Sequence, residues 1–137
     1  MKAILDTNVV VSGIFFGGIP RKIIEYGQKR IFANVISHEI LNEYTDVVKR
    51  VGVQYSVTRA MVILDSIVAA SELTFSILLK EPVCADPKDD KFISAAVAAK
   101  VTIIVSGDKH LKAISGWAGI TVLSPNAFWE KISKPKE

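Results

Sequence analysis

Short apolar runs alternate with longer amphipathic stretches along the whole chain. The apolar runs predict five strands, at residues 2–5, 30–35, 74–79, 102–105 and 120–123. Helical periodicity and capping residues predict helices at residues 20–28, 37–50, 56–73, 86–100 and 109–114, and from residue 125 onward. Strands that alternate with helices and are apolar throughout are typical of a parallel sheet covered on both faces. We therefore expect an α/β fold.

The helix predicted at residues 56–73 departs from the usual amphipathic pattern. Apolar residues occur almost all the way round it: Val57, Met61, Val62, Ile63, Leu64, Ile67 and Val68. A helix of this kind is either deeply buried or covered by another chain.

The length and composition add limits to this picture. A chain of 137 residues is expected to form one domain spanning residues 1–137, with a tail that frays from about residue 133. The net charge of +3 permits nucleic-acid binding without arguing strongly for it. The single cysteine, Cys84, excludes an intrachain disulfide and is expected to be a small buried residue. With no secretory signal and no apolar run long enough for a membrane span, we expect a cytoplasmic protein without a membrane partner.

Several acids follow the predicted strands at the point where each strand ends. Asp6 ends the first strand, Asp108 comes just after the fourth, and Asp86, Asp89 and Asp90 follow the third and open a helix. The carboxyl ends of parallel strands meet at one edge of the sheet, where ligands bind in open α/β folds. The order of elements thus predicts that these carboxylates gather.

Glu43 joins them by a separate argument. On the helix predicted from Ser37, Glu43 lies at the border of the apolar stripe, whereas Glu39 and Asp46 point further toward water. Glu43 is therefore the acid of this helix best placed to be half-buried, and a half-buried carboxylate requires a partner.

Acids that meet without matching cations repel one another, and a divalent cation removes this conflict. Oxygen ligands favour Mg²⁺ or Mn²⁺ over zinc. The sequence offers no convincing Ser or Cys nucleophile, so the expected chemistry is attack by metal-bound water on a phosphodiester. Asp6 would be a ligand, with Thr7 and Asn8 giving hydrogen-bonding support.

Four segments, taken in order, resemble one known family. They are LDTNVVVSG from residue 5, ISHEILNEY from residue 36, DPKDDKFISAAVAA from residue 86 and IIVSGDKHL from residue 103. They resemble the PIN-domain ribonucleases, and among these the toxin-type members of toxin–antitoxin pairs, such as VapC. The resemblance covers roughly residues 2 to 128.

The resemblance implies a three-layer α/β/α sandwich with a mostly parallel five-stranded sheet, and Mg²⁺- or Mn²⁺-dependent cleavage of RNA. The four acids of the family match Asp6, Glu43, Asp90 and Asp108, which would act as metal ligands and catalytic residues. Asn8 and Ser106 match positions that usually support the site. A toxin of this kind also implies a homodimer and a small antitoxin protein as partner.

Some alternatives remain open from the sequence alone. Helical geometry does not choose between Asp89 and its neighbour Asp90 as the ligand. Asp86 is more simply explained as a helix cap, and each of the other aspartates can also stabilise a helix N-terminus. The lysines near the site, Lys88, Lys91, Lys109 and Lys112, either contact RNA phosphates or are solvated.

Two other functions compete with the ribonuclease hypothesis. A haloacid-dehalogenase-type phosphatase also places an aspartate after its first strand, but it needs a second aspartate where this chain has Asn8. The remaining rival is a catalytically weak PIN scaffold that binds RNA or a protein partner without cutting.

Overall fold

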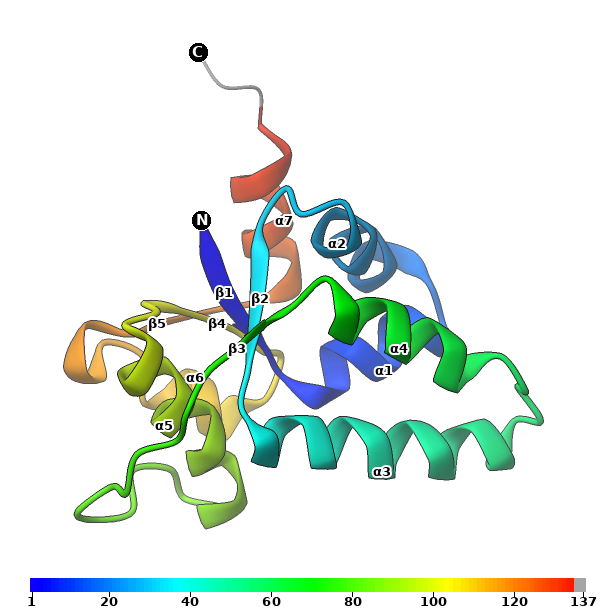
Figure 1. The fold of residues 1–137 in the computed structure, drawn as a ribbon. Coiled ribbons are helices and arrows are strands. Elements are labelled where there is room, and N and C mark those ends of the chain that lie inside the picture. Colours follow the sequence, from blue (N-terminus) through cyan, green and yellow to red (C-terminus); the bar gives the residue numbers. More distant parts are fainter. Residues whose placement is uncertain (135–137) are drawn as a thin grey trace.

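The computed structural model describes residues 1–134 and shows a five-stranded sheet between helices (Figure 1). The strands are β1 (Lys2–Leu5), β2 (Ala33–Ile36), β3 (Glu72–Leu73), β4 (Ile103–Val105) and β5 (Thr121–Leu123). They lie in the order β3-β2-β1-β4-β5, and every neighbouring pair is parallel. This confirms the predicted α/β fold and its parallel sheet.

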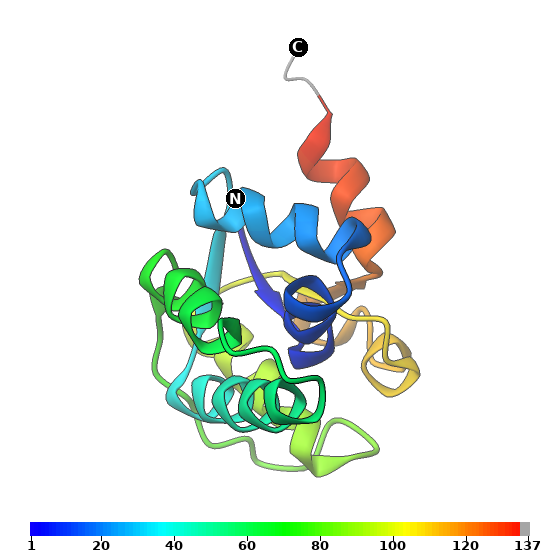
Figure 2. The same cartoon turned by 90° about the vertical axis from the view of Figure 1, so that its right-hand side faces the viewer.

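Helices cover both faces of the sheet (Figures 1 and 2). The helices that come before β3 in the chain are α1 (Thr7–Phe15), α2 (Gly18–Gln28), α3 (His38–Gln54) and α4 (Ala60–Ala69). The later ones are α5 (Asp90–Ala99), α6 (Lys109–Ala113) and α7 (Pro125–Ser133), with short 3₁₀ turns at Pro87–Asp89 and Trp117–Gly119. Helices α1, α2, α4 and α7 form one layer, in which α2 packs against α7, and α5 and α6 lie on the other side. Residues 135–137, where the predicted frayed tail ends, lie outside the described residues.

Helix α1 was not predicted. Its run of valines has a low intrinsic preference for helix. The structure buries these valines between α2, α3 and α4, so tertiary packing outweighs local propensity. Asp6 immediately precedes this helix and adopts the extended conformation of a helix-capping residue.

The third strand is shorter and earlier than predicted. Residues 74–79 look like a strand because their residue types are typical of strands, yet β3 consists only of Glu72–Leu73. Beyond it the chain leaves the sheet, and Phe75 and Leu78 are 88% and 97% exposed. Ser94 on α5 holds this segment by bonding to both backbone groups of Ile77.

The apolar helix is also shorter than predicted, and it is not fully buried. Helix α4 buries Ala60, Leu64 and Ile67, whereas Val62 is 59% exposed. Of the two predictions for this helix, deep burial and coverage by another chain, deep burial is therefore wrong for part of its surface. Among residues 1–134 no helix is both long and apolar enough to span a membrane.

A buried polar contact fixes the end of β1 beside α3. Tyr44 is fully buried, and its hydroxyl donates to the backbone oxygen of Leu5, the residue before Asp6. The side-chain oxygen of Asn34 accepts from the Leu5 amide at 3.2 Å. Helix α3 and strand β2 thereby hold the backbone from which Asp6 projects.

We expect Tyr44→Phe to lower the free energy of unfolding by about 1–2 kcal/mol, because the buried Leu5 carbonyl loses a donor. Urea denaturation followed by circular dichroism measures this cost. Tyr55→Phe is the matched control, since Tyr55 is exposed near the end of α3 and should lose very little. An equal loss in both variants would contradict this role of Tyr44.

Candidate active site

Asp6 lies buried at the carboxyl end of β1, as the sequence predicts. Its backbone amide donates to the Val105 carbonyl at 2.9 Å, so β1 and β4 stay together up to this residue. The fully buried Ser106 hydroxyl donates to the Asp6 carboxylate at 2.8 Å. The end of β4 therefore orients the carboxylate that β1 supplies.

Ser106 also links Asp6 to Asp108. The backbone amide of Asp108 donates to the Ser106 hydroxyl oxygen at 2.9 Å. The Asp108 carboxylate in turn accepts from the His110 amide at 2.6 Å and caps α6, so the predicted capping role is confirmed. One buried hydroxyl thus sets the positions of two acids on neighbouring loops.

Glu43 projects from α3 toward the same edge and is half-buried, as its place on the helix predicts. The Thr7 hydroxyl donates to its carboxylate. The Lys91 ammonium lies 2.8 Å from the same carboxylate, and the two side chains are only 21% and 25% exposed. The expectation that the acids meet without a matching cation is therefore wrong for Glu43, and Lys91 is not a freely solvated lysine.

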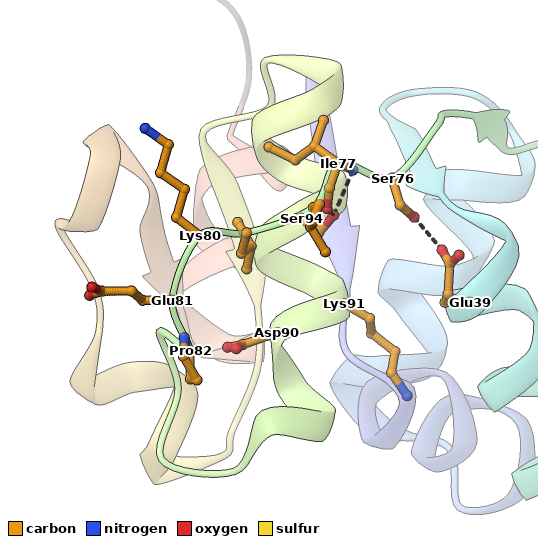
Figure 3. Close-up of a pocket in the computed structure, with 11 residues that line it drawn as sticks. Glu39, Ser76, Ile77, Lys80, Glu81, Pro82, Asp90, Lys91 and Ser94 are labelled. Atoms are coloured by element: carbon orange, nitrogen blue, oxygen red, sulfur yellow. Dashed lines mark hydrogen bonds between the residues drawn. The ribbon is translucent and has the colours of Figure 1, made fainter.

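Asp90 makes structural contacts at the start of α5. Its two carboxylate oxygens accept from the backbone amides of Val83 and Cys84 at 3.1 and 2.8 Å. Figure 3 shows its side chain directed toward the segment that contains Pro82, whereas Lys91 points the other way. This segment, Asp90 and Lys91 border a cleft of about 530 Å³.

The carboxylate of Asp89 interacts electrostatically with the other acids. Partial burial, followed by the charges of Asp108 and Asp6 and then those of Asp86 and Glu43, raises the pKa of Asp89 to about 6. Asp86 accepts from the Lys88 amide at 3.0 Å, which confirms its predicted role as a cap. Of the two neighbouring aspartates, Asp89 is the one whose charge interacts with the acidic edge.

The same repulsion affects Asp6. Burial raises the pKa of its carboxyl group, and the charges of Glu43 and Asp108 act in the same direction, against the lowering effect of the Ser106 hydrogen bond. A group of carboxylates that raise one another's pKa is a group in which a cation is favourable.

The donor chemistry of these residues fits a hard divalent cation, because every candidate ligand is a carboxylate oxygen. In the part of the chain that the structure describes, no three His, Cys, Asp or Glu side chains lie close enough to enclose an ion. Ser106, the His110 amide and Lys91 each hold one of the carboxylates through the bonds given above. Asn8, expected to support the site, is exposed on the first turn of α1.

The raised pKa of Asp89 makes stability depend on pH. Because its pKa is higher in the folded protein than its ordinary value of 3.8, the metal-free fold loses stability as the pH rises through 3.8 toward about 6. We expect Asp89→Asn to be more stable than the wild type above pH 6, by about 1 kcal/mol after solvent screening, and no more stable below pH 4. Urea unfolding in EDTA at both pH values measures the difference.

The exposed Asp65 on α4 provides the matched control for that measurement. Asp65→Asn should show the same difference from wild type at both pH values. A pH-independent effect of Asp89→Asn would show that Asp89 is not repelled by its neighbours.

Cys84 is buried, as predicted, and it does not supply a nucleophile. Burial and its hydrogen bond with Asp90 raise the pKa of its thiol to about 12, so the thiolate is scarce at neutral pH. Trp129 packs against Tyr26 with ring centroids 4.6 Å apart, as expected for a packing residue.

Comparison with known proteins identifies the family of this chain. The sequence profile of the PIN domain matches residues 2–110. The chain belongs to the PIN-domain family. PIN domains are generally nucleases.

Three individual proteins match this chain over nearly its whole length. An uncharacterized protein of Methanocaldococcus jannaschii, MJ1680, is 30% identical over all of this chain and 88% of its own length. The crystal structure of PAE2754 from Pyrobaculum aerophilum superposes with a TM-score of 0.71 at 13% identity, over 97% of this chain and 90% of that one. The crystal structure of VapBC2 from Rickettsia felis, bound to a DNA fragment from its promoter, superposes with a TM-score of 0.57 at 18% identity. The match covers 90% of this chain and 98% of that one. These two structures share the fold.

Proposed function

We propose that this PIN domain is a metal-dependent endoribonuclease. The observation that carries the proposal is the group of acids at the carboxyl edge of the sheet, where burial and then the charges of neighbouring acids raise the pKa values of Asp6 and Asp89. Asp6, Asp89 and Asp108 would hold Mg²⁺ or Mn²⁺, with Glu43 as a further ligand. Asp89 takes the place that the family resemblance gives to Asp90, because backbone amides occupy both Asp90 oxygens.

The residues around the acids prepare them for this role. Ser106 orients the carboxylate of Asp6 by donating to one of its oxygens. The capping bond from His110 fixes Asp108 in the same way. A bound Mg²⁺ or Mn²⁺ would activate a water molecule and offset the negative charge that develops on the phosphodiester.

Basic side chains lie beside these acids. A groove of about 610 Å³ runs beside Glu43, and its lining includes Arg50, Lys88 and Lys91 together with the acids Glu39 and Asp46. Phosphate groups bind lysine and arginine largely through charge, which places the strand without selecting its sequence. In the proposed complex these three basic side chains would contact RNA phosphates, and other contacts would select the target.

Cleavage of a labelled RNA by purified protein tests the proposal. We expect cleavage with Mn²⁺ or Mg²⁺, none in EDTA, and recovery when Mn²⁺ is restored. Protein that binds the RNA equally well with and without the metal but never cuts it would support the rival, a catalytically weak scaffold.

We also propose that the protein acts as the toxin of a toxin–antitoxin pair and forms a homodimer. The neighbour from Rickettsia felis is a VapBC complex, which supports a small antitoxin partner. Exposed apolar side chains lie at the ends of α1 and α3 and on α4: Phe16, Val53, Tyr55, Val57 and Val62. These exposed side chains support a contact with a second chain, and light scattering at micromolar concentration tests for the dimer. A monomer would exclude it.

A further inference from the structure

We propose that Lys91 is a built-in counter-ion of the acidic site, which competes with the metal for Glu43 and passes to the RNA strand when the metal binds. This inference rests on the proposed function and assigns one further residue to it. Lys91 would then be a substrate-positioning residue, since it contacts neither the metal nor the bond that is cut.

The position of Lys91 is unusual for a lysine. It lies in the first turn of α5, where the helix dipole disfavours a positive charge. Its side chain is nevertheless mostly buried and reaches across to α3, where it meets Glu43 at 2.8 Å. The attraction of the acidic edge outweighs the unfavourable helix end, so Lys91 partly neutralises this edge.

A divalent cation changes this balance. Once a charge of +2 lies among Asp6, Asp89 and Asp108 and takes Glu43 as a further ligand, a positive ammonium on Glu43 becomes unfavourable. The Lys91 side chain also lines the groove that contains Arg50 and Lys88, so the released ammonium has a short path to a phosphate. Metal binding and RNA binding would therefore be coupled through one side chain.

Two binding measurements test the coupling. Calorimetry should show that Lys91→Met binds Mn²⁺ about tenfold more tightly than wild type, because its competitor at Glu43 is gone. The second measurement is the slope of the logarithm of the binding constant for a non-cleavable 2′-O-methyl RNA against the logarithm of the salt concentration. With Mn²⁺ present, this slope should be shallower by roughly 0.7 in Lys91→Met than in wild type. Without Mn²⁺ the slope should not change, because Glu43 already occupies Lys91 in the wild type.

Matched variants separate this role from general effects of charge. Lys91→Arg keeps the charge and should retain wild-type Mn²⁺ affinity. Lys88→Met removes an exposed lysine that lines the same groove, so it should lower the salt slope with and without Mn²⁺ and leave the metal affinity unchanged.

A measurement on the wild type needs no folded variant. Acetic anhydride labelling read by mass spectrometry should modify Lys91 several-fold faster after Mn²⁺ is added, whereas Lys88 should react equally in both states. Faster labelling supports the release of Lys91, and unchanged labelling overturns it.

The failures are distinguishable. If wild type binds Mn²⁺ but Lys91→Met binds it equally or more weakly, this inference is wrong and the proposed nuclease stands. If wild type binds no Mn²⁺, both are overturned.

Discussion

Replacing Asp6 by Asn should lower the rate of metal-dependent RNA cleavage roughly a thousandfold. Asn has nearly the same size and can still accept the Ser106 hydrogen bond, but it carries no negative charge. The loss would therefore come from the missing ligand charge at the metal and not from unfolding. Single-turnover cleavage of a labelled RNA at saturating Mn²⁺ measures it.

The metal-free Asp6→Asn protein should also be at least as stable as wild type, because burial raises the pKa of Asp6 and so penalises the ionised carboxylate at neutral pH. Asp65→Asn, on the exposed surface of α4, should keep full activity and serves as the control. Equal cleavage by wild type and Asp6→Asn would indicate a contaminating nuclease and would contradict the assignment of Asp6 to the nuclease site.

The two neighbouring aspartates should fail in opposite ways. Asp89→Asn should lose cleavage by about a hundredfold or more and remain folded, because it removes a charge from the acidic edge. Asp90→Asn should lose about 2 kcal/mol of stability, because an amide group offers only one oxygen to the two backbone amides of Val83 and Cys84. Urea unfolding and Mn²⁺ titration on both variants separate the effects.

The pair is its own matched control, since the change is the same and the positions are adjacent. Folded Asp90→Asn protein should still bind Mn²⁺ close to wild-type affinity. If Asp90→Asn loses the metal and Asp89→Asn keeps it, the family pattern was right and the structural reading of these contacts is wrong.

Much of the site follows from the sequence because parallel strands bring their ends together. Asp6 and Asp108 were predicted to meet from strand order alone, and the structure joins their loops through Ser106. Glu43 was found from its place at the border of an apolar stripe, which is a property of helix geometry. These predictions needed only the order and period of the elements.

The remaining features depend on side-chain contacts that no local pattern contains. Asp89 and Asp90 are adjacent acids, and the choice between them depends on where the amides of residues 83 and 84 lie. Lys91 was one of several lysines near the site, and only the approach of α5 to α3 pairs it with Glu43. Helix α1 and the short strand β3 were missed because packing and a single serine, Ser94, outweigh local propensity.

A crystal soaked in Mn²⁺ tests the central claim most directly. The account predicts an anomalous peak bonded to carboxylate oxygens of Asp6, Asp89 and Asp108, with the Asp90 oxygens still on the amides of Val83 and Cys84. A site that stays free of manganese at saturating concentration, with Lys91 still on Glu43, would contradict it.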